Sequence, residues 1–140
     1  MPEIEEFWII NWSGTPLFSY SPSIKLEFNI MSSFFSALQS FAVQLIDEKK
    51  ESYVNAIAIG EYNYNFLSHS LYQVYFVSKS LKSLKPKNIK THLQNIASLF
   101  INKYGEELFE FDGEVTKFEA FLDEFHEYFK GNFKKLKGIW

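Results

Sequence analysis

The sequence contains no cysteine among its 140 residues. Disulfides, thiolate metal sites and cysteine nucleophiles are therefore excluded. Arginine is also absent, so lysine supplies all 14 basic residues. Bidentate recognition of phosphate or guanine relies heavily on arginine, and the net charge is −3, so we expect no nucleic-acid partner. Codon bias is the simpler explanation of the missing arginine.

Long apolar runs are missing as well. None approaches the roughly 20 residues that a membrane-spanning helix needs. The first ten residues carry three glutamates, whereas a signal peptide carries basic residues there. We therefore expect a cytoplasmic protein, which at most lies peripherally against a membrane.

The elements of a catalytic site are also lacking. The chain has six glycines and matches neither GxxxxGK[ST] nor GxGxxG, so a phosphate-binding loop is not indicated. His69, His92 and His126 are too widely spaced for a paired metal motif. We expect no metal, no cofactor and no enzymatic activity.

Apolar and aromatic residues, in contrast, are abundant. Hydrophobic residues make up 46% of the chain and aromatic residues 19%, including 16 phenylalanines. A disordered chain lacks this apolar content, so a packed core is expected. A chain of this length suits one domain.

Five short segments rich in β-branched and aromatic residues are predicted to be strands. The first two flank the turn signal Ser13-Gly14-Thr15-Pro16 and form a hairpin. Gly60 separates the third segment from the fourth, and Ser68-His69-Ser70 is expected to turn the chain into the fifth. The predicted strands are residues 7–12, 17–20, 53–59, 62–67 and 71–77.

The first helix is predicted over residues 30–47, with Asn29 as its cap. Its apolar residues recur at the i, i+3, i+4, i+7 spacing of an amphipathic helix. Phe34 and Phe35 both belong to this stripe and are expected to face the core.

Two further helices follow a basic linker at residues 79–87. Asn88 is predicted to cap the second helix, and Asp112-Gly113 to end it. The third helix is predicted over residues 115–129, and a basic, aromatic tail follows at 130–140. The domain is therefore expected to span residues 1–129.

The predicted order ββ-α-βββ-α-α indicates an α+β fold, in which helices flank one five-stranded antiparallel sheet. This order resembles that of the longin domains, which share a profilin-like architecture. The hairpin at 8–20 is similar to the first hairpin of longin domains. The helical stretch at 35–42 and the stretch at 100–118 are similar to archaeal longin-like proteins found beside small GTPases. The related roadblock proteins usually begin with a helix, whereas this chain begins with a strand.

The resemblance implies a sheet order of second, first, fifth, fourth and third strand, with the third at an edge. It also implies a non-catalytic module, an adaptor or regulator of a small GTPase or of a membrane-trafficking-like complex. The first helix would lie on one face of the sheet, with the last two on the other face or at its edge. The implied partner is a small GTPase or a longin or roadblock relative, in a homodimer or heterodimer.

The expected contact surface combines the first helix with the third strand. The helix side away from the apolar stripe has small residues instead of lysine and glutamate, so another helix can approach it closely. The third strand is apolar on both sides, and an unprotected apolar edge favours a covering partner. The candidate partner-binding residues are Ser33, Ser36, Ala37, Ser40, Gln44, Tyr53, Asn55, Ile57 and Ile59.

Charge is sorted along the chain. Residues 62–105 hold six lysines and no carboxylate, whereas 106–127 hold nine carboxylates and one lysine. Such fields can steer a partner, although uneven surface charge without a function is an equal alternative. The tail 130–140 has the composition of a weak membrane-surface contact, or of a frayed or packed end.

A small-ligand sensor is the alternative function. Profilin-like sheets can hold a ligand between the sheet and its helices, but no convergent polar set marks a pocket in the sequence. A filled core with an adhesive helix–strand face would favour the interaction module, and a polar-lined internal cavity the sensor.

Overall fold

A computed structural model describes residues 4–20, 34–40 and 55–137, with side chains as far as residue 129. Residues 34–40 are helical; they are the only part of the predicted helix 30–47 within the described ranges. The other elements are β1 (Glu6–Asn11), β2 (Pro16–Tyr20), β3 (Ala56–Ile59), β4 (Tyr62–His69), β5 (Val74–Leu81), α2 (Pro86–Phe109), the 3-10 helix η1 (Thr116–Ala120) and α3 (Phe121–Lys137).

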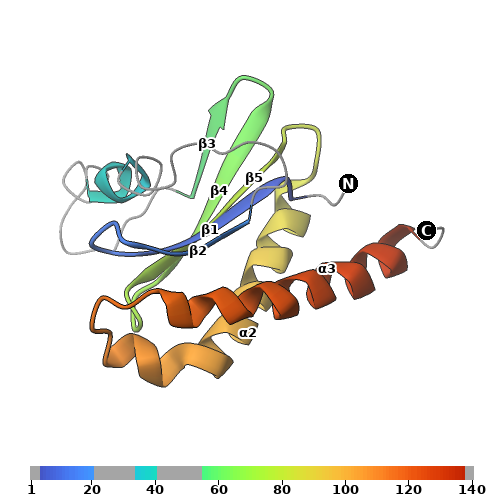
Figure 1. Ribbon diagram of the computed structural model, residues 1–140. Helices are drawn as coiled ribbons and strands as arrows, with labels where there is room; N and C mark the ends of the chain where they lie inside the picture. Colours follow the sequence, from blue (N-terminus) through green and yellow to red (C-terminus); the bar gives the residue numbers. More distant parts are fainter. Residues whose placement is uncertain (1–3, 21–33, 41–54, 138–140) are drawn as a thin grey trace.

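The five strands form one antiparallel sheet in the order β2-β1-β5-β4-β3. This confirms the predicted α+β fold and its strand order. β3 therefore lies at one edge and β2 at the other, while β1, β5 and β4 occupy the interior (Figure 1).

Side chains alternate between the two faces of the sheet, and each face has its own core. On β1, Phe7 and Ile9 face α2 and α3, whereas Trp8 and Ile10 face the helical segment 34–40, on the opposite side in Figure 1. The large core cluster comprises Ile4, Phe7, Ile9, Leu17, Phe18, Val74, Phe76, Ile89, Leu93, Ile96, Ala97, Phe100, Tyr104, Phe118, Phe121 and Phe125. The small core cluster comprises Trp8, Ile10, Phe35, Tyr64, Phe66, Tyr75 and Val77.

The β1–β2 turn is held by the side chain of Asn11. Its Oδ1 accepts hydrogen bonds from the backbone N–H of Ser13 at 3.1 Å and of Thr15 at 2.9 Å. The Ser13 hydroxyl donates a third at 2.7 Å. A short side-chain amide that satisfies turn donors in this way explains why the hairpin closes here.

The connection between β4 and β5 differs from the prediction. Ser68 and His69 belong to β4, and the turn comprises residues 70–73. Gln73 provides the left-handed backbone conformation of this turn, with a φ of 56°. The expected turn at 68–70 is therefore wrong, because polar residues in a half-exposed strand resemble turn residues in the sequence.

The fifth strand, β5, lies further along the chain than predicted for the same reason. It runs from Val74 to Leu81, so Leu71 is not in the strand and Lys79 is. The predicted linker 79–87 thus begins within the sheet. Lys79 is flanked by the buried Ser78 and Ser80 and follows a buried apolar run in the same strand. The neighbouring residues therefore keep Lys79 in the strand despite its charge.

The ends of α2 and α3 show two further differences. α2 begins at Pro86 with Lys85 as its cap residue, so the predicted Asn88 cap is wrong. Proline is favoured in the first helical turn because its missing N–H would have no partner there. The third helix begins as η1 and continues as α3 to Lys137, so helical backbone covers residues 130–137 as well.

Candidate functional site

The helical segment 34–40 is fixed to the sheet by one aromatic side chain. Phe35 is fully buried. Its ring centroid lies 5.4 Å from that of Trp8, 5.9 Å from Tyr64 and 5.3 Å from Phe66. Gln39, one helical turn later, is also buried. The inner side of the segment therefore packs on the small core cluster.

Ser36 ties the same segment to the β1–β2 hairpin. Its hydroxyl donates a hydrogen bond of 2.9 Å to the carbonyl oxygen of Trp12, and the residue is half-buried. Of the candidate contact residues, Ser36 thus has a structural partner within the chain.

The outer side of the segment presents small residues and one aromatic ring. Ala37 and Ser40 are exposed. Phe34, expected in the core stripe, is 46% exposed, so that expectation is wrong. Consecutive helical residues point about 100° apart, so with Phe35 directed at the sheet Phe34 lies at the margin of the stripe. Phe34 enlarges the apolar area beside Ala37.

β3 provides the second part of the site. It pairs only with β4 among the described residues, so its outer edge is open within that part of the chain. Ile57 is half-buried against the small core cluster, and Ile59 is 48% exposed. Asn55 is exposed just before the strand, and its carbonyl accepts the N–H of Phe66 at 2.9 Å.

Tyr64 joins the two parts. It lies opposite Ile57 in the β3–β4 register and packs against Phe35. The segment 34–40 and the apolar side of β3 therefore share one face of the sheet. Ser33, Gln44 and Tyr53 lie outside the described residues.

A charged pair beside Tyr64 was missed in the sequence. The Lys79 Nζ lies 4.3 Å from the ring centroid of Tyr62 and 4.0 Å from the Glu6 Oε2. Burial raises the pKa of Tyr64, and the positive charge of Lys79 opposes this. Because Lys79 was assigned to a linker, only the correct span of β5 could have placed it here.

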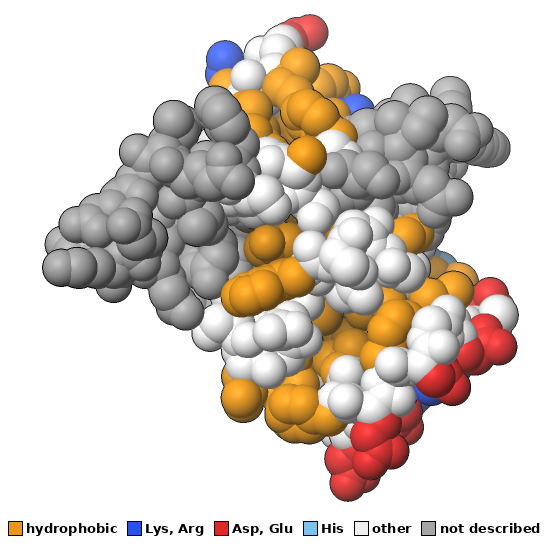
Figure 2. Space-filling view, turned by 90° about the vertical axis from the view of Figure 1, so that its left-hand side faces the viewer, with side chains coloured by type: hydrophobic (Ala, Val, Ile, Leu, Met, Phe, Trp, Pro, Cys, Tyr) orange, Lys and Arg blue, Asp and Glu red, His pale blue; other side chains and the backbone are white. Residues whose placement is uncertain are grey.

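The acidic stretch 106–127 lies at another end of the molecule. Figure 2 shows carboxylates crowded beside apolar side chains at the lower right of that view. All nine are exposed except Glu124, which is half-buried and accepts a hydrogen bond from Lys103. Within the described part of the chain, no group of histidine, aspartate and glutamate residues could hold a metal ion.

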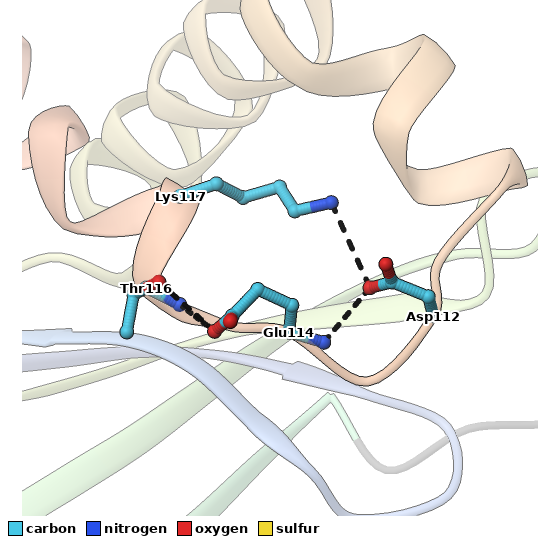
Figure 3. A network of polar contacts seen from close by, with 4 residues as sticks. All are labelled: Asp112, Glu114, Thr116 and Lys117. Carbon is cyan, nitrogen blue, oxygen red and sulfur yellow. Dashed lines mark hydrogen bonds and ion pairs between the residues drawn. The ribbon is translucent and has the colours of Figure 1, made fainter.

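Two of these carboxylates organise the loop between α2 and η1 (Figure 3). The Asp112 Oδ1 accepts the backbone N–H of Glu114 at 2.9 Å, which lowers the pKa of Asp112 together with the charge of Lys117 at 3.8 Å. Glu114 accepts the backbone N–H of Thr116 at 3.1 Å and its hydroxyl at 2.9 Å. These two bonds lower the pKa of Glu114.

No protein-family model and no curated protein matches the sequence. Many solved structures have a similar fold, and three of them illustrate the similarity. Myxococcus xanthus MglB superposes with a TM-score of 0.56 at 10% identity, over 71% of this chain and 85% of that one. A Roadblock/LC7 domain from Streptomyces avermitilis gives 0.52 at 8% identity, over 71% and 88%. A chain of the signal recognition particle receptor SRb-GTP/SRX complex from Chaetomium thermophilum gives 0.54 at 18% identity, over 95% and 98%.

This chain has the longin/roadblock-like fold. The expected family resemblance is thereby confirmed at the level of the fold, and the leading hairpin matches the longin expectation.

Within this longin/roadblock-like fold the three histidines occupy separate places. His92 is buried, and its Nδ1 lies 2.8 Å from the hydroxyl oxygen of Tyr128. His69 packs beside Tyr72, and the ring of His126 lies edge-on to Tyr20. In the described ranges, none of the helices has the length and apolar character needed to span a bilayer.

Proposed function

We propose that this chain is a non-catalytic protein-interaction module of longin type, which acts as an adaptor or regulator of a small GTPase or of a membrane-trafficking-like complex. Its contact surface is the outer side of segment 34–40 together with β3. The observation that carries the proposal is the position of β3. It is an apolar edge strand, and its Ile57 side lies on the same face of the sheet as segment 34–40.

The edge of β3 lacks the features that protect edge strands. Its four residues are alanine and isoleucine, of which Ala56, Ala58 and Ile59 are exposed, and none is lysine or proline. Unpaired backbone groups flanked by exposed apolar side chains favour pairing with another chain. A strand from the partner would satisfy these groups and cover the side chains.

The small side chains of segment 34–40 suit the same partner. Ala37 and Ser40 are exposed and allow close approach of a second helix, and Phe34 adds an aromatic contact. Aromatic side chains dominate the energetics of such contacts. A helix and a strand from one partner could therefore bind together, in a homodimer or in a heterodimer with a longin or roadblock relative.

The GTPase part of the proposal rests on two similarities. The sequence resembles longin-like proteins found beside small GTPases, and one structural neighbour comes from a complex that contains GTP. We also propose that the protein is located in the cytoplasm.

The test places two charges in the proposed contact. The double variant Ala37→Lys, Ser40→Lys leaves Phe35 and the core untouched, and it should abolish association because unpaired charges would be buried. The matched control is Ser98→Lys, Asn102→Lys, which adds the same charge to an exposed side of α2. Light scattering measures self-association, and a pull-down with and without a GTP analogue measures binding to other proteins.

Two outcomes would contradict the proposal. A wild-type chain that remains monomeric at high concentration rules out the homodimer. A double variant that keeps every partner of the wild type shows that the contact surface lies elsewhere.

A further inference from the structure

A hollow of about 300 Å³ opens on the α2 side of the sheet, away from segment 34–40. It lies where β4 extends past the beginning of β3: Ala56 pairs with Asn65, and the remainder of β4 has no β3 partner. The start of α2 forms its other wall. The lining includes Asn55, Asn65, Ser68, Pro86, Lys90 and Leu93.

Asn65 is the unusual member of this lining. The residue is 91% buried and lines the hollow, and its side chain forms no hydrogen bond with any described residue. Directly across the strands, Ser78 is fully buried, and its hydroxyl has no partner either. Burial of polar groups without hydrogen bonds is unfavourable, so such groups commonly mark a place that a ligand or water completes.

The electrostatics of this wall favour an anion. The positive end of the α2 dipole lies here, with no side-chain cap at Lys85 and no acidic residue in the first turn. Lys90 lines the hollow, and it forms no ion pair with a described residue. The sequence from 62 to 105 contains no carboxylate that could neutralise this end. Helix N-termini with a nearby lysine and an amide donor provide what an oxyanion requires.

We infer that this hollow binds a small molecule through an oxyanion, either a phosphate or a carboxylate group. The Asn65 amide donates a hydrogen bond to the oxyanion, while Lys90 and the start of α2 provide positive charge. The hollow opens on the opposite face of the sheet from segment 34–40. Of its lining, Asn55 and Ala56 also belong to the β3 end of the proposed protein contact, whereas Asn65 and Lys90 do not. Variants of Asn65 and Lys90 therefore test this site separately from that contact. Asn65 and Lys90 come from separate elements, β4 and α2, so no local sequence pattern indicates this site.

The test is a titration of uniformly ¹⁵N-labelled protein with sodium phosphate, and separately with sodium acetate. Sodium chloride at matched ionic strength provides the reference. We expect at least one of the two oxyanions to shift the Asn65 side-chain amide and the first-turn amides of α2 more than chloride does.

Two variants test the residues. Asn65→Asp keeps the shape of the side chain but puts a negative charge in the hollow, and Lys90→Gln removes the positive one. Each should weaken binding roughly tenfold, as the loss of one charge-assisted hydrogen bond predicts. Asn102→Asp and Lys103→Gln, on α2 away from the hollow, are the matched controls and should bind like the wild type.

Thermal unfolding of every variant shows whether it is folded. If Asn65→Asp is not folded, Asn65→Ser replaces it, and weaker binding is still expected. Shifts that chloride reproduces in full would overturn the inference, because they would show screening alone. Unchanged binding in folded Asn65 and Lys90 variants would also overturn it.

Discussion

Glu114 shows how single side chains stabilise the loop between α2 and η1. Its pKa is lowered because Thr116 donates two hydrogen bonds to the carboxylate. A group with a depressed pKa in the folded state contributes stability above its pKa in the unfolded chain. That stability is lost as the pH falls through the folded value. The loop should therefore loosen as the pH falls below the ordinary glutamate range.

Thr116→Val tests this contribution. The variant keeps the backbone N–H but removes the hydroxyl, so the pKa of Glu114 should rise toward its ordinary value without reaching it. An NMR titration of the Glu114 side-chain carbon measures the change. The carboxyl of Asp112 is the internal control, since its main donor is the backbone N–H of Glu114. An unchanged pKa at Glu114 would show that the hydroxyl bond does not persist in solution.

Individual residues also show why the candidate site was only partly predictable. Ala37 and Ser40 are exposed as their place opposite the stripe indicated. Phe34 and Lys79 were misplaced, because hydrophobicity alone cannot choose between adjacent phenylalanines or decide whether a lysine lies in a strand. The side-chain environment of Asn65 depends on where α2 crosses the sheet, which no local pattern encodes.

At the scale of elements, periodicity predicted the fold well. All five strands and the helical segments appear in the expected order, because alternating and 3.6-residue patterns reflect which face is buried. Boundaries were less predictable. The last residues of β4 and the first residues of α2 have only weak preferences for a strand or a helix. Contacts with neighbouring elements therefore determine where β4 ends and α2 begins.

The charges of α2 oppose its dipole. Lysines surround its first turn and glutamates occupy its last turns, with no acidic residue at the start and no basic residue at the end. This arrangement destabilises a helix, because each end carries charge of the same sign as the dipole there. The stability of the helix therefore does not explain this charge distribution. An anion bound at the start of α2 would explain the lysines there.

Lys87→Glu reverses one of these charges. Lys87 is exposed in the first turn and does not line the hollow, so the variant should stabilise the protein by about 0.3–1 kcal/mol at low salt. Chemical denaturation measures the difference, which should shrink in high salt because screening weakens the dipole interaction. Ser98→Glu, in the middle of α2, is the control and should have little effect. A destabilised Lys87→Glu would show that another interaction determines the charge at this end.

At the scale of the whole molecule, the sheet separates two cores but also joins them. Each interior strand contributes to both clusters: Trp8 and Ile10 of β1 belong to the small one, Phe7 and Ile9 to the large one. Loss of packing on one face therefore disturbs strands that the other face requires. We expect the described domain to unfold in one cooperative step.

Two optical probes can test this cooperativity, because they report on different faces. Trp8 and Trp12 both pack with the small core cluster, so their fluorescence follows that face once Trp140→Phe removes the third tryptophan. Far-ultraviolet circular dichroism is dominated by the long helices α2 and α3 on the other face. In the Trp140→Phe background, both signals should give the same midpoint of denaturation.

Matched substitutions in the two cores make the test decisive. Phe35→Leu and Phe121→Leu each remove part of a fully buried ring, one from each cluster, and each should cost roughly 1–2 kcal/mol. If the sheet couples the faces, each variant lowers both midpoints equally. A Phe35→Leu variant in which fluorescence changes at lower denaturant than circular dichroism would show that the small core cluster unfolds independently. The proposed contact surface would then open without loss of the remaining fold.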